Sequence, residues 1–89
     1  MKVWVFQPTQ ETLASAVFSS KEKAEDWINR LDASGILTSY VVDESALQTH
    51  IRSGWFTPKR DHHHTPEFEA RFTGGAEHFH YNMSPAGSE

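Results

Sequence analysis

The sequence predicts a single small domain of the α+β class, in which one long and one short helix cover one face of a mostly antiparallel sheet. Segments with strand composition flank a segment with clear helical periodicity. The chain has 89 residues, enough for one core but not for two. It has no cysteine, so apolar burial must stabilise that core without disulfides. We predict the order β-β-α-β-α-β-β over residues 1–82, followed by a flexible tail over residues 83–89.

The first two elements are predicted to form a hairpin. Residues 2–6 (KVWVF) carry β-branched and aromatic side chains at successive positions, which is typical of a central strand or one covered on both faces. Turn-forming residues follow at positions 8–12, and residues 14–19 then alternate between apolar and polar. A hairpin is the simplest arrangement of two such strands.

A long helix is predicted next. Ser19 and Glu22 have the spacing of a capping box, which marks a helix N-terminus. Gly35 is predicted to end the helix, because glycine adopts the left-handed conformation at little steric cost. Apolar residues between them recur at helical spacing and should face the sheet: Ala24, Trp27, Ile28 and Leu31.

A third strand and a shorter helix follow. Residues 36–42 (ILTSYVV) are rich in β-branched side chains, which favours a strand. Asp43 or Ser45 is predicted to cap a helix over residues 44–53, because both side chains accept hydrogen bonds from backbone amides at a helix N-terminus. Two apolar residues four positions apart should face inward from this helix, Leu47 and Ile51.

The C-terminal part is predicted to be a loop and a second hairpin. Residues 55–66 have no periodicity and contain two prolines, which indicates a loop. Phe68, Ala70 and Phe72 then alternate with polar residues, as in a half-exposed strand. Gly74-Gly75 matches a two-residue type I′ turn. A tight turn there would place Glu69 opposite His80.

Several stretches also carry a family pattern. They are VWVF (3–6), SAVFSSKEKAEDWI (15–28), SGILTSYVVDE (34–44), GWFTPK (54–59), TPEF (65–68) and EHFHY (77–81). In these stretches the chain resembles a family of small, uncharacterised bacterial proteins, a domain of unknown function. The turn over residues 73–76 and the sequence after Tyr81 depart from the family's pattern. Because the family has no established activity, the resemblance implies no function.

The histidines suggest a metal site. His62, His63 and His64 lie in the predicted loop, and His78 and His80 would share one face of the last strand. Imidazole binds zinc and other divalent transition metals. The predicted hairpin adds a carboxylate beside His80, so one hypothesis is a site formed by the following residues: Glu69, His78, His80 and a loop histidine such as His64.

A second interpretation of the same residues involves no cofactor. Polar residues that face each other across an antiparallel hairpin commonly form a solvated sheet face. Arg71, predicted beside His78, would also repel a metal cation. A polar loop is an adequate explanation for the three consecutive histidines.

The predicted loop offers a candidate surface for binding a partner. Trp55 and Phe56 are followed closely by Lys59 and Arg60. Aromatic and arginine side chains dominate the energetics of protein interfaces, and aromatic and basic residues together also bind single-stranded nucleic acid. The alternative is that Trp55 and Phe56 only seal the end of the core.

Composition and motifs exclude several classes of protein. No cysteine nucleophile, phosphate-binding glycine loop or nucleophile elbow is present, so we expect no enzyme. The net charge of −4 argues against a nucleic-acid partner. The apolar run over residues 3–6 is too short for a signal peptide, and no segment is long enough to span a membrane. Together with the absence of cysteine, this favours the cytoplasm.

These observations predict a small interaction module that binds another macromolecule, most simply a protein. A compact acidic chain suits a stoichiometric inhibitor of the immunity, antitoxin or anti-defence type, because negative charge steers it to a basic partner. The alternative is a metal-binding domain that uses the histidine and glutamate cluster. A homodimer is a further expectation, since an exposed strand edge can pair with a second copy.

Overall fold

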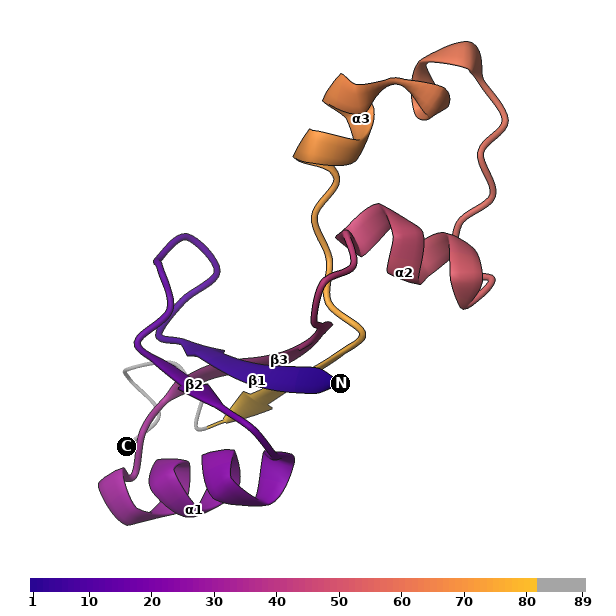
Figure 1. Cartoon of the computed structure of the whole chain (residues 1–89). Coiled ribbons are helices and arrows are strands. Elements are labelled where there is room, and N and C mark those ends of the chain that lie inside the picture. The colour runs from indigo at the N-terminus through magenta and orange to yellow at the C-terminus, as the bar shows by residue number, and fades with distance from the viewer. Residues whose placement is uncertain (82–89) are drawn as a thin grey trace.

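The structure is a computed structural model of the chain, and it describes residues 1–81 (Figure 1). It contains one four-stranded antiparallel sheet with the strand order β2-β1-β3-β4. The α+β class and the antiparallel sheet are therefore confirmed. The predicted tail, residues 83–89, lies outside the described residues. The elements are β1 (Lys2–Gln7), β2 (Ala16–Phe18), α1 (Lys21–Leu31), β3 (Gly35–Val41), α2 (Ala46–Arg52), the 3-10 helix η1 (Asp61–His64), α3 (Pro66–Arg71) and β4 (Glu77–Tyr81).

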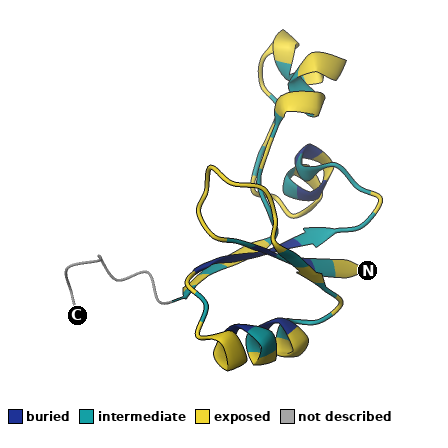
Figure 2. Cartoon of the chain, turned by 90° about the vertical axis from the view of Figure 1, so that its left-hand side faces the viewer, coloured by how far each residue is buried: buried dark blue, intermediate teal, exposed yellow. Residues whose placement is uncertain are grey.

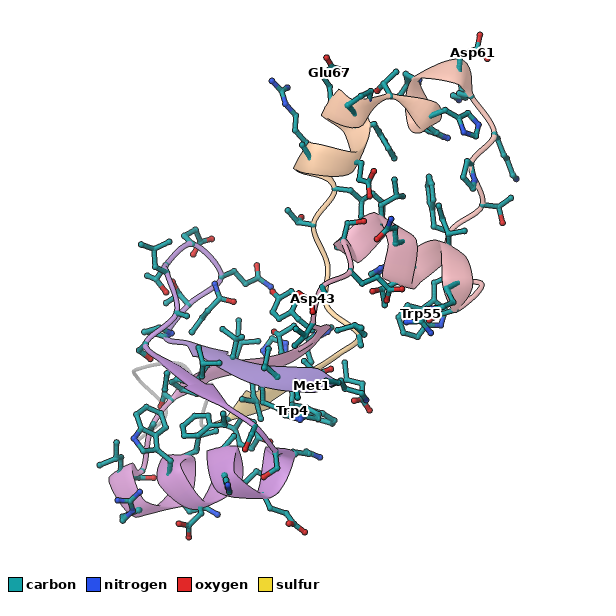
Figure 3. All side chains as sticks on the ribbon, viewed as in Figure 1. Met1, Trp4, Asp43, Trp55, Asp61 and Glu67 are labelled. Atoms are coloured by element: carbon teal, nitrogen blue, oxygen red, sulfur yellow. The ribbon has the colours of Figure 1, made fainter. Side chains whose placement is uncertain are left out.

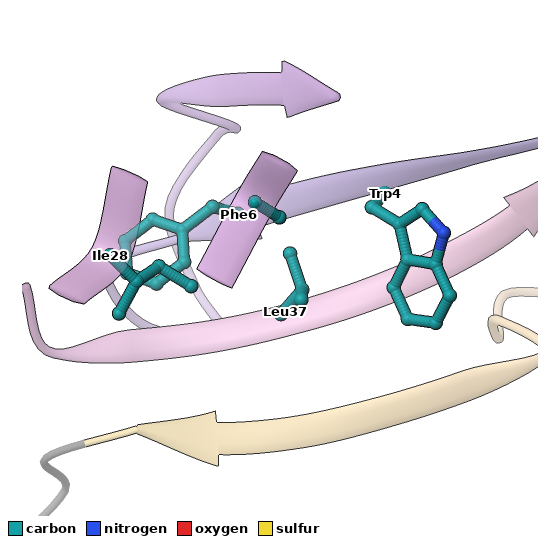
Figure 4. Packing of buried hydrophobic residues seen from close by; sticks show 5 residues of the cluster. Trp4, Phe6, Ile28 and Leu37 are labelled. Carbon is teal, nitrogen blue, oxygen red and sulfur yellow. The ribbon is translucent and has the colours of Figure 1, made fainter. Parts of the chain in front are cut away.

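The main core lies between α1 and one face of the sheet. β1 is central, with β2 and β3 as its neighbours. Phe6 pairs with Leu37 of β3, and Leu37 pairs in turn with Phe79 of β4, so these side chains share the face that α1 covers. Figure 4 shows how closely this cluster packs. Its buried members are Trp4, Phe6, Ala24, Ile28 and Leu37.

The long helix begins and ends close to the predicted positions. Ser20, one residue later than predicted, is its N-cap and accepts a hydrogen bond from the amide of Lys23 at 3.1 Å. Asp32 ends the helix in the left-handed conformation that was predicted for Gly35. Gly35 is instead the first residue of β3, where an added Cβ would collide with the carbonyl of Gln7. Leu31, predicted to face the sheet, is exposed.

A second lobe is inserted between β3 and β4. Figure 1 shows α2, η1 and α3 on the side of the sheet away from α1, so the predicted short helix does not share the face of the long one. The rings of Phe56, Phe68 and Phe72 meet there with centroid distances of 5.3 to 5.8 Å. None of the three is fully buried. We call α2, η1, α3 and the segments that join them the inserted lobe (Figure 2).

The predicted strand over residues 67–73 is wrong, because this segment belongs to α3. Thr65 caps the helix by accepting a hydrogen bond from the amide of Phe68 at 3.1 Å, and Pro66 occupies its first turn. Proline suits that position, where its missing N–H has no helical partner. β4 consequently pairs with β3 and not with a preceding hairpin strand.

The Gly74-Gly75 pair does not form a hairpin turn. It lies where the chain returns from α3 and comes close to β3. A Cβ on Gly75 would overlap the side chain of Thr38 and lie 2.6 Å from the carbonyl oxygen of Ser39. The amide of Ala76 donates to that same carbonyl at 2.7 Å. Gly75 therefore lets the returning chain approach β3 closely enough to start β4.

No helix in residues 1–81 is long and apolar enough to cross a membrane.

Candidate interaction surface

The C-terminal end of α2 fixes the position of Trp55. Gly54 has a φ of 80°, and its amide donates to the carbonyl of Ile51 at 3.1 Å. The amide of Trp55 donates to the carbonyl of His50 at 2.8 Å. These two bonds form a Schellman motif, which ends a helix and turns the chain sharply. The motif also brings the indole of Trp55 against the His50 ring, at 5.2 Å between centroids.

Trp55 lines a groove where the inserted lobe meets the sheet. The groove has a volume of about 310 Å³. Figure 3 shows Trp55 at the end of α2, on the side of the lobe nearer to Met1 and Trp4. Trp55 keeps 54% of its surface exposed, although tryptophan is among the largest apolar side chains. The other lining residues are Lys2, Val41, Thr49, Arg52, Ser53, Ala76 and Glu77.

The charged side chains that line this groove all form ion pairs. Lys2 forms an ion pair with Glu77 at 3.1 Å. Arg52 donates from its Nε and one terminal nitrogen to the two carboxylate oxygens of Glu44, at 3.0 and 2.7 Å. These bonds, and one from the Thr49 hydroxyl, lower the pKa of Glu44 to about 2. Arg52 is therefore held in one orientation at the groove by a carboxylate that stays ionised.

Phe56 does not share this surface, although it follows Trp55 directly. Its ring packs against Phe68, Phe72 and His63 inside the inserted lobe. These contacts agree with the alternative that Phe56 seals a core, and its contact with a partner stays a prediction. Trp55 is the more exposed residue of the aromatic pair.

Lys59 and Arg60 are exposed, but they lie further along the loop and do not line the groove. Their backbone amides donate to Nδ1 of His63 at 3.1 and 3.3 Å. Nδ1 can accept these bonds only without a proton. Partial burial, together with positive charge on His62, Arg60 and His64, lowers the pKa of His63 below its usual value. His63 therefore organises the loop in its neutral form.

The predicted metal site is not assembled. Glu69 lies on α3, where it accepts a hydrogen bond from the hydroxyl of Ser45 at 2.6 Å. Glu69 and His64 both line a cavity next to α2. His78 and His80 do share one face of β4, as predicted, with their rings 5.4 Å apart. They pair with Thr38 and Ile36 of β3 and not with Glu69.

The predicted site depended on a hairpin about Gly74-Gly75, which would have placed Glu69 next to His80. This hairpin does not form, because residues 66–71 are helical. Within residues 1–81, no group of three or more histidine, aspartate or glutamate side chains is arranged to hold a metal ion. The remaining large hollow, of about 470 Å³ on the sheet face away from α1, includes His78 and is otherwise lined by uncharged residues.

The sequence did not point to several residues in and behind the groove. The ring of His50 does not line the groove but contacts the rings of Trp55 and Phe72, each at 5.2 Å between centroids, and its Nδ1 donates to the carbonyl of Ala46. Lys2 and Glu77 reach the groove from parts of the chain that are distant from Trp55. The Ser-Gly-Trp sequence after α2 is the one local signal, because glycine after a helix predicts a Schellman motif and fixes the next residue.

A comparison with protein families gives one match. The family described as Domain of unknown function (DUF7710) matches residues 3–86. The chain belongs to this family. The DUF7710 match spans the whole sheet, α1 and the inserted lobe, so the lobe is part of the family's domain. No curated protein and no solved structure matches the chain.

Proposed function

We propose that this protein is a non-enzymatic interaction module that binds a protein partner at the Trp55 groove. The observation that carries the proposal is the half-exposed indole of Trp55, held in place by a Schellman motif beside a groove with paired charges. A rigid indole loses little conformational entropy on binding, and exposed tryptophans are frequent binding hot spots.

The surroundings of Trp55 support a protein partner. Lys2, Arg52 and Glu77 provide both signs of charge at the groove, which suits the mixed polar rim of a protein interface. A phosphate backbone would instead require a surface of uncompensated cations. Here Lys2 and Arg52 each form an ion pair with a glutamate.

The specific form of the proposal is a stoichiometric inhibitor of the immunity, antitoxin or anti-defence type. Size and charge support it, because the chain has only 89 residues and a net charge of −4. An acidic protein is attracted over long range to a basic partner such as a nuclease, which raises the rate of association.

The test is a binding measurement with a matched control. The partner is captured from the organism that carries the gene and then purified, and its binding is titrated by calorimetry. Trp55→Ala should weaken binding by about thirtyfold or more, the effect of losing a hot spot of roughly 2 kcal/mol. Leu31→Ala is the control, because Leu31 is 55% exposed but lies on α1. It should leave the affinity unchanged.

Two results would contradict the proposal. One is a purified partner whose affinity is the same for the wild type and for Trp55→Ala. The other is a failure to capture any protein in a molar ratio near one to one. The proposal of a stoichiometric inhibitor makes a further demand. The partner must have an activity that falls to zero when one molar equivalent of this protein is added.

A further inference from the structure

The sheet has two edges, and they differ in how well they are protected. β2 has three residues, whereas β4 has five, all paired with β3 without interruption. Natural edge strands are usually protected by proline, lysine, a bulge or shortness. β4 (EHFHY) has no proline, lysine or bulge, and its one charged side chain, Glu77, is at the end of the strand and is paired with Lys2. Among the described strands, β3 is its one neighbour, so its outer row of backbone amides and carbonyls faces away from the sheet.

The side chains of β4 are arranged symmetrically about Phe79. His78 and His80 flank it on one face of the sheet, and Glu77 and Tyr81 flank it on the face of α1. When two copies of a strand pair antiparallel about a twofold axis, the residue before the axis faces the residue after it in the other copy. An axis at Phe79 therefore places His78 opposite the second copy's residue 80.

This pairing brings compatible side chains together at every position. Phe79 meets its own copy, and Glu77 faces the tyrosine at position 81, so an apolar pair is flanked by polar pairs. The histidines face histidines, and both are exposed in the single chain. No position places two permanent like charges opposite each other, which would be unfavourable. Thr38 and Ile36, their partners on β3, are also uncharged.

We propose that two copies of this chain pair through β4 and form one continuous antiparallel sheet. The occupant of the edge is a second copy because the strand is complementary to itself in this one register. The proposed dimer shares Glu77 with the Trp55 groove, but it does not use Trp55, and His78 and His80, which test it, do not line that groove. The dimer and the proposed function can therefore fail separately.

Charge substitutions at the two histidines test both the dimer and its register. Sedimentation velocity at pH 7.5 should find the wild type dimeric. His78→Lys with His80→Lys places two lysine pairs opposite each other and should raise the dimer dissociation constant by about tenfold. His78→Lys with His80→Glu places lysine opposite glutamate twice and should restore the dimer. Both variants change exposed side chains, and circular dichroism checks that each is folded.

A mixing experiment adds a second measurement. The double-lysine variant and the corresponding double-glutamate variant should each be largely monomeric alone and should form a heterodimer when combined. The proposal is overturned if the wild-type protein is still monomeric at a concentration of about 100 µM, at which even a weak dimer would be populated. It is also overturned by a double-lysine variant that dimerises as well as the wild type. A lysine and glutamate variant that stays monomeric overturns the register about Phe79, and with it the proposed interface.

Discussion

Tyr81 connects the last strand to the long helix through a single hydrogen bond. Its hydroxyl donates to the carboxylate of Glu25 at 2.8 Å. Partial burial and this carboxylate both disfavour the ionised phenol, and they raise the pKa of Tyr81 to about 12. A neighbouring contact strengthens the same junction, because Nζ of Lys21 lies 3.8 Å from the centre of the Phe79 ring. β4 is thus attached to α1 as well as to β3.

We expect Tyr81→Phe to lower the free energy of unfolding by about 1 kcal/mol, the usual net value of one hydrogen bond. The stabilisation by Tyr81 is fully present below pH 10, where the unfolded phenol is also neutral. It is lost as the pH rises from 10 towards 12, because only the unfolded state ionises in that range. Absorbance at 295 nm in a Tyr40→Phe background reports Tyr81 alone. A midpoint near pH 10 would contradict the hydrogen bond to Glu25.

At the scale of elements, helix ends determine where the exposed groups lie. Ser45 begins α2 with a complete capping box, in which Gln48 is the reciprocal partner. Gly54 ends α2 with the Schellman motif. Thr65 and Pro66 begin α3. The direction in which Trp55 leaves α2 follows from these caps and not from a large buried contact.

Gly54→Ala is expected to destabilise the protein by about 1 kcal/mol, because the positive φ at this position is unfavourable for a residue with a Cβ. No atom lies within 4 Å of the position that the Cβ would take, so the backbone alone is tested. Gly54→Asn should cost less, since asparagine tolerates the left-handed conformation. Chemical denaturation measures both. Equal stability of the alanine variant and the wild type would show that the motif does not form.

The elements also show which predictions from the sequence could succeed. β1, α1, β3 and α2 match their predictions because each has one consistent pattern, and the two helices also have their own caps. The segment after Thr65 has two patterns at once. Phe68, Ala70 and Phe72 alternate as in a strand, but Phe68 and Phe72 are also four apart, as on one face of a helix. The helix forms because Thr65 and Pro66 start it and Phe56 covers both rings.

The candidate site was only partly predictable for a related reason. Trp55 was identified from its type and its place in a loop, and the structure leaves it exposed. Lys2 and Glu77 lie at opposite ends of the described chain and meet because β1 and β4 both pair with β3. Such long-range neighbours depend on strand order, which local periodicity does not reveal. The predicted cluster of Glu69 with His78 and His80 does not form, because it depended on one assumed strand pairing.

At the scale of the whole molecule, the sheet with α1 buries more side chains than the inserted lobe does. The cluster between α1 and the sheet has five buried members. In the inserted lobe, Leu47 and Thr49 are the buried residues of α2, while η1 and α3 have none. Burial of apolar surface is the main source of stability, so the lobe has less of it than the sheet. Figure 2 shows the exposed character of α3.

We therefore expect amides of α3 and η1 to exchange hydrogen faster than those of β1 and β3, by at least a hundredfold. Exchange in the lobe should accelerate further as the pH falls below 6.5, after correction for the intrinsic rate. His63 has a lowered pKa in the folded chain, so it stabilises the lobe fully above 6.5 and less as it becomes protonated. Mass spectrometry measures both effects, and His63→Asn should remove the second. Uniform protection across the chain would contradict this division.

The place of insertion has a consequence for how the domain can vary in length. Residues 42–76 leave β3 and return to β4, two adjacent antiparallel strands that a short turn could join. Closing so long a connection costs about 2 kcal/mol more chain entropy than closing a four-residue turn. The sheet and α1 contain the main core without it. Replacing residues 42–76 by a short turn should therefore leave a folded ββαββ domain, and lobes of other sizes can be accommodated at the same point.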